Sequence, residues 1–385
     1  MSHADFQNEI YSGGLSGVRP ALPTDLTRLE ALAAERLSTE VYAYVAGSAG
    51  TAATARANRA AFAKWRLVPR MLRDVSQPEL SVTVFGTTMP APVLLGPVGV
   101  QAILHPDGEL ATARAAAALG VPVVVSTAAS RTMEQVAEAA GPRWYQLYWP
   151  NDRKLAASFL RRANAAGYTA LVVTLDTYRM AWRPGDLDAA HLPFLRGVGV
   201  QNFFSDPEFQ RSVGGEITDE NRSAAMLRWT ETFGDPSLTW DDLAWLRKEW
   251  TGPIALKGIQ HPDDARRAAD AGMDGVIVSN HGGRQVDGAV ASLDQLPPIV
   301  DAVGEELTVL FDSGIRTGAD IAKALALGAR AVLIGRPYAY GLSLGGESGV
   351  RHVLRCLLAE LELTLTLSGH RRPSELTRDV LTPVG

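Results

Sequence analysis

Short apolar runs alternate with longer amphipathic stretches along the chain from about Pro92 onward. The apolar runs are rich in β-branched residues and have no polar face, which is typical of strands buried on both sides. Eight runs predict strands, at Val93–Leu95, Val121–Val125, Tyr145–Leu147, Ala170–Leu175, Ile254–Leu256, Gly275–Val278, Thr308–Phe311 and Ala331–Ile334. The alanine-rich stretches between them predict helices such as Gly108–Leu119, Asp152–Ala166, Pro262–Ala271 and Gly318–Leu327.

This alternation predicts a parallel sheet covered by helices. Eight strand–helix units favour closure into a (β/α)8 TIM barrel over an open doubly wound sheet, and no Gly-x-Gly-x-x-Gly turn follows the first strand. We expect one barrel domain over residues 1–385, with a helical N-terminal extension at 1–73 that includes amphipathic segments at Thr24–Leu37 and Thr39–Ala46. Residues 184–238 form a long insertion after strand four. Its length and its aromatic residues favour a packed lid; those residues are Phe194, Phe203, Phe204, Phe209 and Trp229.

Polar, charged or glycine residues follow every predicted strand. The carboxyl ends of barrel strands form the face on which barrel enzymes place their active sites. The alternative is that strands simply end in turn formers. That alternative explains the glycines and prolines, but it does not predict the charged or titratable Lys257, His281, Asp312 and Arg336. We therefore expect a functional site on this face.

The segment Ser279–Gln285, with the sequence Ser-Asn-His-Gly-Gly-Arg-Gln, directly follows the strand predicted at Gly275–Val278. Asparagine and glycine allow the backbone to turn sharply and to approach a flat ligand. An arginine can grip a carboxylate as a bidentate fork, and an imidazole can take a proton from a neighbouring hydroxyl. His281 and Arg284 therefore indicate chemistry on a small hydroxy-carboxylate, although a histidine at a strand end is often only a hydrogen-bonded structural residue.

Two glycine-rich turns, Asp312–Gly318 and Gly335–Pro337, follow strands seven and eight, and each contains an arginine. Barrels commonly bind phosphate at this position, through backbone N–H groups and positive charge. Plain turns are the alternative. Lys257, after strand five, lies between apolar residues, and a buried lysine is costly unless it meets an anion. The alternative is an exposed lysine at a strand terminus.

Composition narrows the class of protein. The chain has 385 residues, 46% hydrophobic residues and a formal net charge of −5, as expected of a globular enzyme. No Lys/Arg-rich block points to a nucleic acid. The single cysteine, Cys356, excludes an internal disulfide, and no run of about 18 apolar residues predicts a membrane helix. The first ten residues lack the apolar core of a secretory signal, so we expect a cytoplasmic protein; we assign no metal ligands.

Six segments together resemble the FMN-dependent family that oxidises L-2-hydroxy acids, which includes glycolate oxidase, lactate oxidase and mandelate dehydrogenase. They are Tyr145–Tyr148, Val173–Thr177, Leu256–Gly258, Ser279–Gln285, Asp312–Gly318 and Gly335–Pro337. The resemblance spans nearly the whole chain. Within the family, the segments at 8–11, 44–47, 182–187, 193–197 and 257–267 are most similar to lactate 2-monooxygenase.

The resemblance implies FMN as cofactor, a small 2-hydroxy acid and O2 as partners, and a homo-oligomer, either a tetramer or an octamer. It implies that His281 is the active-site base and that Asp176 orients the imidazole and raises its pKa. The implied substrate contacts are Tyr44, Tyr148, Arg183 and Arg284. The implied cofactor contacts are Pro97, Val98, Gly99, Ser126, Gln146, Thr174, Lys257, Ser279, Asp312, Ser313, Gly314, Arg316, Gly335 and Arg336.

Taken singly, several of these residues have plainer interpretations. Tyr44 and Tyr148 could be packing residues, Asp176 a helix N-cap, and Arg183 part of a solvated lid. Three features also depart from the family. Ala128 stands where glycolate oxidase has a tryptophan, which implies a roomier pocket; Thr177–Ala181 differ from the monooxygenase; and Phe203 replaces a tyrosine expected in the insertion.

The expected reaction is oxidation of L-lactate with O2. If pyruvate is retained, the products are acetate, CO2 and water, as in lactate 2-monooxygenase; if it is released, they are pyruvate and H2O2, as in an oxidase. Release or retention depends on the lid. A dehydrogenase with another acceptor is a third outcome. Outside this class, the alternatives are an FMN-dependent isomerase and a phosphate-ligand-binding barrel that is not an oxidase.

Overall fold

The computed structural model describes residues 2–384, and its centre is a closed barrel of eight parallel strands. The order around the barrel is β10-β11-β4-β5-β6-β7-β8-β9, so neighbours in sequence are neighbours in space. The predicted (β/α)8 TIM barrel is therefore confirmed. The strands are β4 Val93–Leu95, β5 Val123–Ser126, β6 Arg143–Tyr148, β7 Leu171–Thr174, β8 Ile254–Ile259, β9 Gly275–Val278, β10 Thr308–Phe311 and β11 Ala331–Ile334.

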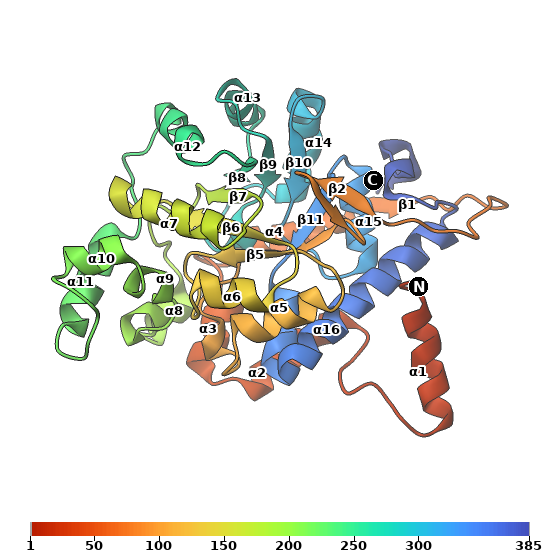
Figure 1. The fold of residues 1–385 in the computed structure, drawn as a ribbon. Coiled ribbons are helices and arrows are strands. Elements are labelled where there is room, and N and C mark those ends of the chain that lie inside the picture. The colour runs from red at the N-terminus through yellow and green to blue at the C-terminus, as the bar shows by residue number, and fades with distance from the viewer. Residues whose placement is uncertain (1, 385) are drawn as a thin grey trace.

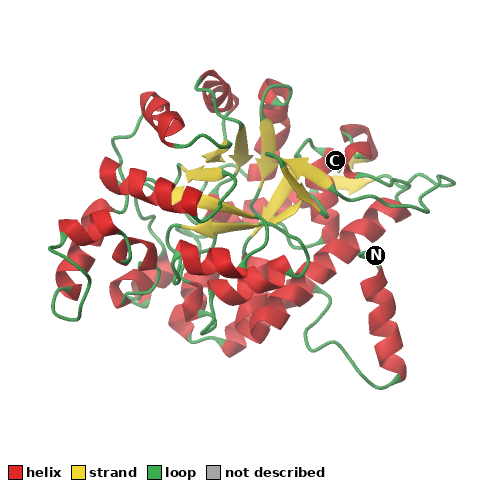
Figure 2. Ribbon diagram, in the orientation of Figure 1, coloured by secondary structure: helices red, strands yellow, loops and turns green. Residues whose placement is uncertain are grey.

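Helices surround the strands, as Figures 1 and 2 show. Helix-capping side chains fix where several of them begin. Asp152 accepts bonds from the backbone of Lys154 and Leu155, and Thr317 forms a capping box with Asp320. The barrel helices are α5 Glu109–Ala117, α6 Met133–Ala139, α7 Arg153–Ala165, α12 Leu243–Glu249, α13 Pro262–Asp270, α14 Ser292–Val303, α15 Gly318–Ala326 and α16 Arg336–Leu367.

The barrel has two hydrophobic cores. One lies between the strands and the helices, and the other fills the barrel interior with side chains such as Leu94, Trp144 and Ile277. A hairpin made of β2 (Val82–Val84) and β3 (Thr87–Met89) packs Val82, Val84 and Met89 into the interior core. It closes the amino-terminal end of the barrel, so only the carboxyl ends of the strands are available for a deep site.

The N-terminal extension is helical up to Ala63 rather than up to residue 73. Its helices are α1 Asp5–Leu15, α2 Leu29–Arg36, α3 Thr39–Ala46 and α4 Ala53–Ala63, with a 3-10 turn at Leu26–Arg28 where a longer helix was expected. The extension then forms strand β1 (Trp65–Leu67), which pairs antiparallel with β12 (Leu381–Pro383). Helix α3 faces the carboxyl ends of the barrel strands, and α4 contacts the turn that follows β9.

The insertion folds into short helices that lie together beside the barrel (Figure 1). They are α8 Pro184–Asp188, α9 Gln201–Phe204, α10 Pro207–Ser212 and α11 Arg222–Thr232, with a 3-10 turn at Pro193–Arg196. A second 3-10 turn, Trp240–Asp242, follows the insertion and leads into α12. Phe194, Phe203, Phe209 and Trp229 are buried and pack on one another. The insertion is thus a packed structure rather than a linker. Over residues 2–384, no helix is both long and apolar enough to span a bilayer.

Candidate active site

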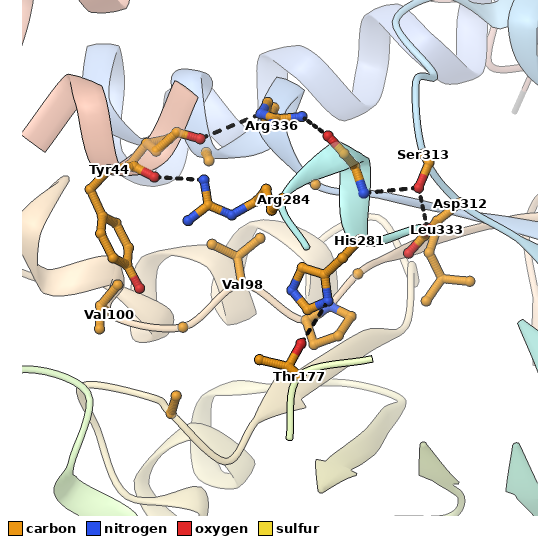
Figure 3. A pocket seen from close by; sticks show the side chains of 18 of the residues that line it. Tyr44, Val98, Val100, Thr177, His281, Arg284, Asp312, Ser313, Leu333 and Arg336 are labelled. Atoms are coloured by element: carbon orange, nitrogen blue, oxygen red, sulfur yellow. Dashed lines mark hydrogen bonds between the residues drawn. The ribbon is translucent and has the colours of Figure 1, made fainter. Parts of the chain in front are cut away.

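A cavity of about 180 Å³ opens at the carboxyl ends of the barrel strands (Figure 3). Most of the residues predicted from the sequence lie in its wall. They are Tyr44, Pro97, Val98, Gly99, Tyr148, Arg183, Lys257, His281, Arg284, Asp312, Ser313, Gly314, Arg316, Gly335 and Arg336. The other five predicted residues, Ser126, Gln146, Thr174, Asp176 and Ser279, do not line it; each is bonded to a residue of the wall or to another of the five.

His281 enters the cavity from the turn after β9. Its backbone is left-handed, with φ of 58°, and the Asn280 side chain holds this turn by accepting a bond from the Gly283 N–H at 3.1 Å. The His281 Nδ1 atom lies 2.8 Å from Oδ1 of Asp176. Because an ionised carboxylate only accepts hydrogen bonds, Nδ1 carries the proton and Nε2 is left with a lone pair. The Thr177 hydroxyl, 3.2 Å from Nδ1, also donates to Asp176 Oδ1 at 3.0 Å.

The electrostatics of this pair keep the imidazole neutral. Burial lowers the pKa of His281, and this outweighs the opposing effect of the Asp176 carboxylate; Lys257 lowers the pKa further. The rise expected from the carboxylate alone is therefore reversed. Burial by itself would raise the pKa of Asp176, but the charges of protonated His281 and of Lys257 lower it to about 2. At neutral pH the site therefore holds a neutral imidazole beside a carboxylate, the state that a proton acceptor requires.

Two guanidinium groups reach the cavity beside His281. Arg284 donates from Nη1 to the carbonyl oxygens of Tyr44 and Gly47, both at 2.7 Å, and lies over the Tyr44 ring. Arg183 donates from Nε to the Arg284 carbonyl at 3.0 Å. Burial, and then the neighbouring Arg284, lower the pKa of Arg183 to about 10, so it stays charged at neutral pH. The two side chains are anchored to backbone yet keep N–H groups for a ligand.

Tyr44 on α3 and Tyr148 at the end of β6 add two phenols to the wall. The Tyr44 ring packs edge-on against Phe194, and the Tyr148 ring packs against Phe233. Burial raises the pKa of both hydroxyls, so both remain protonated donors. Within residues 2–384 neither hydroxyl has a hydrogen-bond partner, although the rings do pack as the plainer interpretation expected. Both are available to a ligand.

A second group of cations lies at the ends of β10 and β11. Arg336 donates to the carbonyls of Gly282 and Gly47, each at 2.9 Å, and burial lowers its pKa to about 10. Burial also lowers the pKa of Arg316. Gly314 has φ of 96° and sits so close to α4 that an added Cβ would lie 2.9 Å from the Asn58 carbonyl. These turns bring backbone and guanidinium groups together, as the sequence predicted.

A row of polar side chains runs beneath the cavity. Ser126 donates to Gln146 at 2.9 Å, and Gln146 donates to Thr174 at 3.0 Å, so adjacent strands β5, β6 and β7 each contribute one residue. Lys257 on β8 donates to Ser279 at 2.9 Å and pairs with Asp312 at 3.0 Å. Its side chain is 4% exposed, so the buried interpretation of Lys257 is confirmed.

The charges in the cavity wall do not balance. Asp312 is the one carboxylate in the wall, against Lys257 and four arginines. Lys257 pairs with Asp312, and Asp186 approaches Arg183 only to 3.9 Å; among the described residues, no carboxylate lies within 4.0 Å of the guanidinium group of Arg284, Arg316 or Arg336. Buried charges normally have a partner, because desolvation is costly. The residues present therefore fit an anionic ligand, with a phosphate at the Arg316–Arg336 end and a carboxylate at the Arg183–Arg284 end.

The cavity wall also includes Phe233 and Met180, which the sequence had not singled out as site residues. Phe194, Trp229 and Phe233 of the insertion cover the cavity together with Met180, and the aromatic spacing of the insertion was the available signal. Ala128 lines the cavity. Phe203 does not: it is fully buried against Phe159 and Phe209, so it belongs to the core of the insertion.

Comparison with known proteins shows the family of this chain. The family described as FMN-dependent dehydrogenase matches residues 33–383. An FMN-dependent alpha-hydroxy acid dehydrogenase of Penicillium citrinum is 49% identical over 387 residues, covering 99% of this chain and 96% of that protein. An L-lactate oxidase of Lysinibacillus sphaericus is 41% identical, covering 90% of this chain and 89% of that protein. The crystal structure of mandelate oxidase with (S)-4-hydroxymandelic acid has a TM-score of 0.84 and 38% identity, covering 94% and 99% of the two chains.

Proposed function

Since the chain belongs to the FMN-dependent dehydrogenase family and FMN is its cofactor, we propose that it oxidises a small L-2-hydroxy acid, L-lactate first, with O2 as acceptor. The observation that carries this proposal is the meeting, in one cavity, of a neutral imidazole with a free Nε2 and two guanidinium groups. The guanidinium groups can bind the carboxylate of such an acid, and the imidazole can accept the proton of its 2-hydroxyl. The proposal is therefore specific for adjacent carboxylate and hydroxyl groups.

The residues at the phosphate end would hold the cofactor. FMN, when bound, accepts two electrons from the substrate and passes them to the acceptor. Arg316, Arg336 and the backbone of Gly314 and Gly335 would bind its phosphate, with Ser313 beside them. Asp312 and Ser279 would bind the ribityl chain. Lys257, together with Ser126, Gln146 and Thr174 of the polar row beneath the cavity, would bind the polar edge of the ring system. Pro97, Val98 and Gly99 of the wall would also contact the ring system.

The remaining wall residues would bind and deprotonate the substrate. Arg183 and Arg284 bind the carboxylate and so fix the orientation of the acid. The Tyr44 and Tyr148 phenols donate to its oxygens. His281 Nε2 then takes the hydroxyl proton, and Asp176 stabilises the imidazolium that forms. Phe194, Trp229 and Phe233 exclude water from this end of the cavity.

We propose the lactate 2-monooxygenase outcome for the product, in which lactate and O2 give acetate, CO2 and water. Two observations support it: the segments most similar to that enzyme, and the aromatic cover that the insertion lays over the cavity, which favours retention of pyruvate. The second candidate is release of pyruvate and H2O2. It is favoured by the 41% identity to a protein named L-lactate oxidase.

Oxygen uptake with product analysis distinguishes the monooxygenase outcome from the oxidase outcome. With L-lactate, one acetate and one CO2 for each O2 would support the monooxygenase, whereas stoichiometric pyruvate and H2O2 would overturn it in favour of the oxidase. Anaerobic addition of 2-hydroxy acids tests the class itself. Flavin that lactate and larger 2-hydroxy acids all fail to reduce would overturn the whole proposal and leave a barrel that binds the cofactor for another reaction.

We also propose that the protein is a homo-oligomer, a tetramer or an octamer, as the family resemblance implies. Light scattering coupled to size-exclusion chromatography measures this directly. A mass near 41 kDa would show a monomer and contradict the proposal.

A further inference from the structure

Gln285 ends the segment Ser279–Gln285 and has no role in the chemistry described so far. Its side chain contacts both Arg183, at the carboxylate end of the cavity, and Asp176, which is bonded to His281. Oε1 accepts a hydrogen bond from Arg183 Nη2 at 2.5 Å. Nε2 donates to the main-chain oxygen of Asp176 at 2.5 Å and to that of Arg179 at 3.3 Å. One side chain thus joins the arginine of the carboxylate end to the residue that contacts the base.

The chemistry of these contacts requires an amide. A guanidinium group only donates hydrogen bonds, and a main-chain carbonyl only accepts them. A side chain that bridges the two must therefore accept at one atom and donate at another. The same argument fixes the orientation of the Gln285 amide, with its oxygen toward Arg183 and its nitrogen toward Asp176. Glutamate and methionine lack the donor, and asparagine is one methylene shorter.

Arg183 depends on this contact because its own segment holds it weakly. The arginine immediately precedes α8, and the nearest carboxylate on that helix, Asp186, lies 3.9 Å from Nη1. Neither oxygen of Asp186 has a hydrogen-bond partner among the described residues. The acceptors that do hold the Arg183 side chain are the Arg284 carbonyl and the Gln285 amide, both from the turn after β9 that also carries His281.

We propose that Gln285 is a positioning residue that keeps Arg183 in register with the Asp176–His281 pair. The proposal rests on the proposed function, in which Arg183 binds the substrate carboxylate. Gln285 itself does not line the cavity. It fixes the separation between the group that grips the acid and the group that takes its proton, which is the distance on which proton transfer depends.

The test uses the purified holoenzyme and its Gln285→Met variant, which keeps the length of the side chain and loses both polar contacts. Pyruvate serves as the probe, and its Kd is measured from the perturbation of the flavin spectrum. The same titration is run on Arg183→Met and on the double variant, which completes a double-mutant cycle. Val286→Ala is the matched control, because the neighbouring Val286 side chain is 62% exposed. Anaerobic flavin reduction by L-lactate and by L-lactamide gives a second measurement.

Gln285→Met should raise the Kd of pyruvate about tenfold in the wild-type background, the effect of losing one hydrogen bond to a charged group. In the Arg183→Met background it should change the Kd less than twofold. Reduction by lactate should slow far more than reduction by lactamide, because the amide carries no charge for Arg183 to hold. A general loss of structure would instead slow flavin reduction by both substrates to the same extent. If the Gln285→Met variant fails to retain flavin, the Gln285→Asn variant replaces it and should give the same pattern.

Equal effects of Gln285→Met in the two backgrounds, or an unchanged Kd, would overturn the positioning role. Failure of the proposed function has a different signature. In that case Arg183→Met itself would leave pyruvate binding unchanged, or the wild-type flavin would respond to no 2-oxo or 2-hydroxy acid. Val286→Ala should match the wild type in every measurement.

Discussion

Replacing Asp176 by asparagine should slow flavin reduction by roughly 30-fold or more while leaving the substrate site assembled. The amide oxygen can keep the 2.8 Å bond from His281 Nδ1, so the change removes charge more than geometry. The second carboxylate oxygen, Oδ2, has no hydrogen-bond partner among the described residues, so the new NH2 group breaks no existing bond. The variant therefore measures what the negative charge contributes once His281 has taken the proton.

The pKa of Asp176 gives the magnitude. Its fall from an ordinary 3.8 to about 2 means that the folded site favours the charged carboxylate by about 2 kcal/mol, at about 1.36 kcal/mol for each tenfold change. Burial opposes this preference, and the positive charges of protonated His281 and of Lys257 outweigh it. The loss of about 2 kcal/mol from the state with an imidazolium corresponds to roughly a 30-fold slower proton transfer, and more where burial is not relieved.

The assay is anaerobic stopped-flow reduction of the bound flavin at saturating L-lactate. Flavin content and the Kd of pyruvate should stay near the wild-type values, because Asp176 touches neither ligand in the proposed site. Asp188→Asn is the matched control: it removes an exposed carboxylate on α8 that does not line the cavity. A reduction rate within about threefold of the wild type, with flavin retained, would refute the argument that Asp176 stabilises the imidazolium.

Three further outcomes follow from the cavity wall. Lys257→Met should lower the free energy of unfolding by about 3 kcal/mol and should release flavin, because it leaves the half-buried Asp312 carboxylate without its cation. Exposed Lys248→Met is the control, and a wild-type Tm for Lys257→Met would contradict this. Arg336→Met should reduce the preference of the apoprotein for FMN over riboflavin at least tenfold in fluorescence titrations, and an unchanged ratio would place the phosphate elsewhere. The value of kcat/KM should rise with pH through the pKa of His281, since only the neutral ring accepts a proton. Burial lowers that pKa, so the midpoint of the rise should lie below 6.5. A midpoint above 6.5 would argue against His281 as the base.

The barrel strands could be predicted because their pattern is local. Largely apolar runs marked all eight, and β4, β9, β10 and β11 have the predicted bounds. The β2–β3 hairpin was missed because each of its strands is three residues long, and the alternation of buried and exposed residues in β2 spans too few positions to identify a strand. The β1–β12 pair was missed for a different reason. Its partners are far apart in the chain, and neither strand forms without the other.

Within the candidate site, the residue types were predictable and their exact neighbours were not. Charged residues at strand ends identified His281, Arg284, Lys257 and the glycine-rich turns, because a barrel brings strand ends together. The direction in which the pKa of His281 is shifted depends on how deeply the ring is buried, and no local sequence pattern contains that information. The bridging role of Gln285 depended on the paths of two loops over the barrel.

The antiparallel pairing of β1 with β12 has a consequence for synthesis of the protein. Helix α4 supports the Gly314 turn from behind: an Arg59 guanidinium group bonds the Gly314 carbonyl, and the strand that follows α4 is β1. Because β1 pairs with residues 381–383, a nascent chain cannot form this pairing until those residues have left the ribosome. The strand that continues from α4 therefore gains its partner only after every barrel strand has been made.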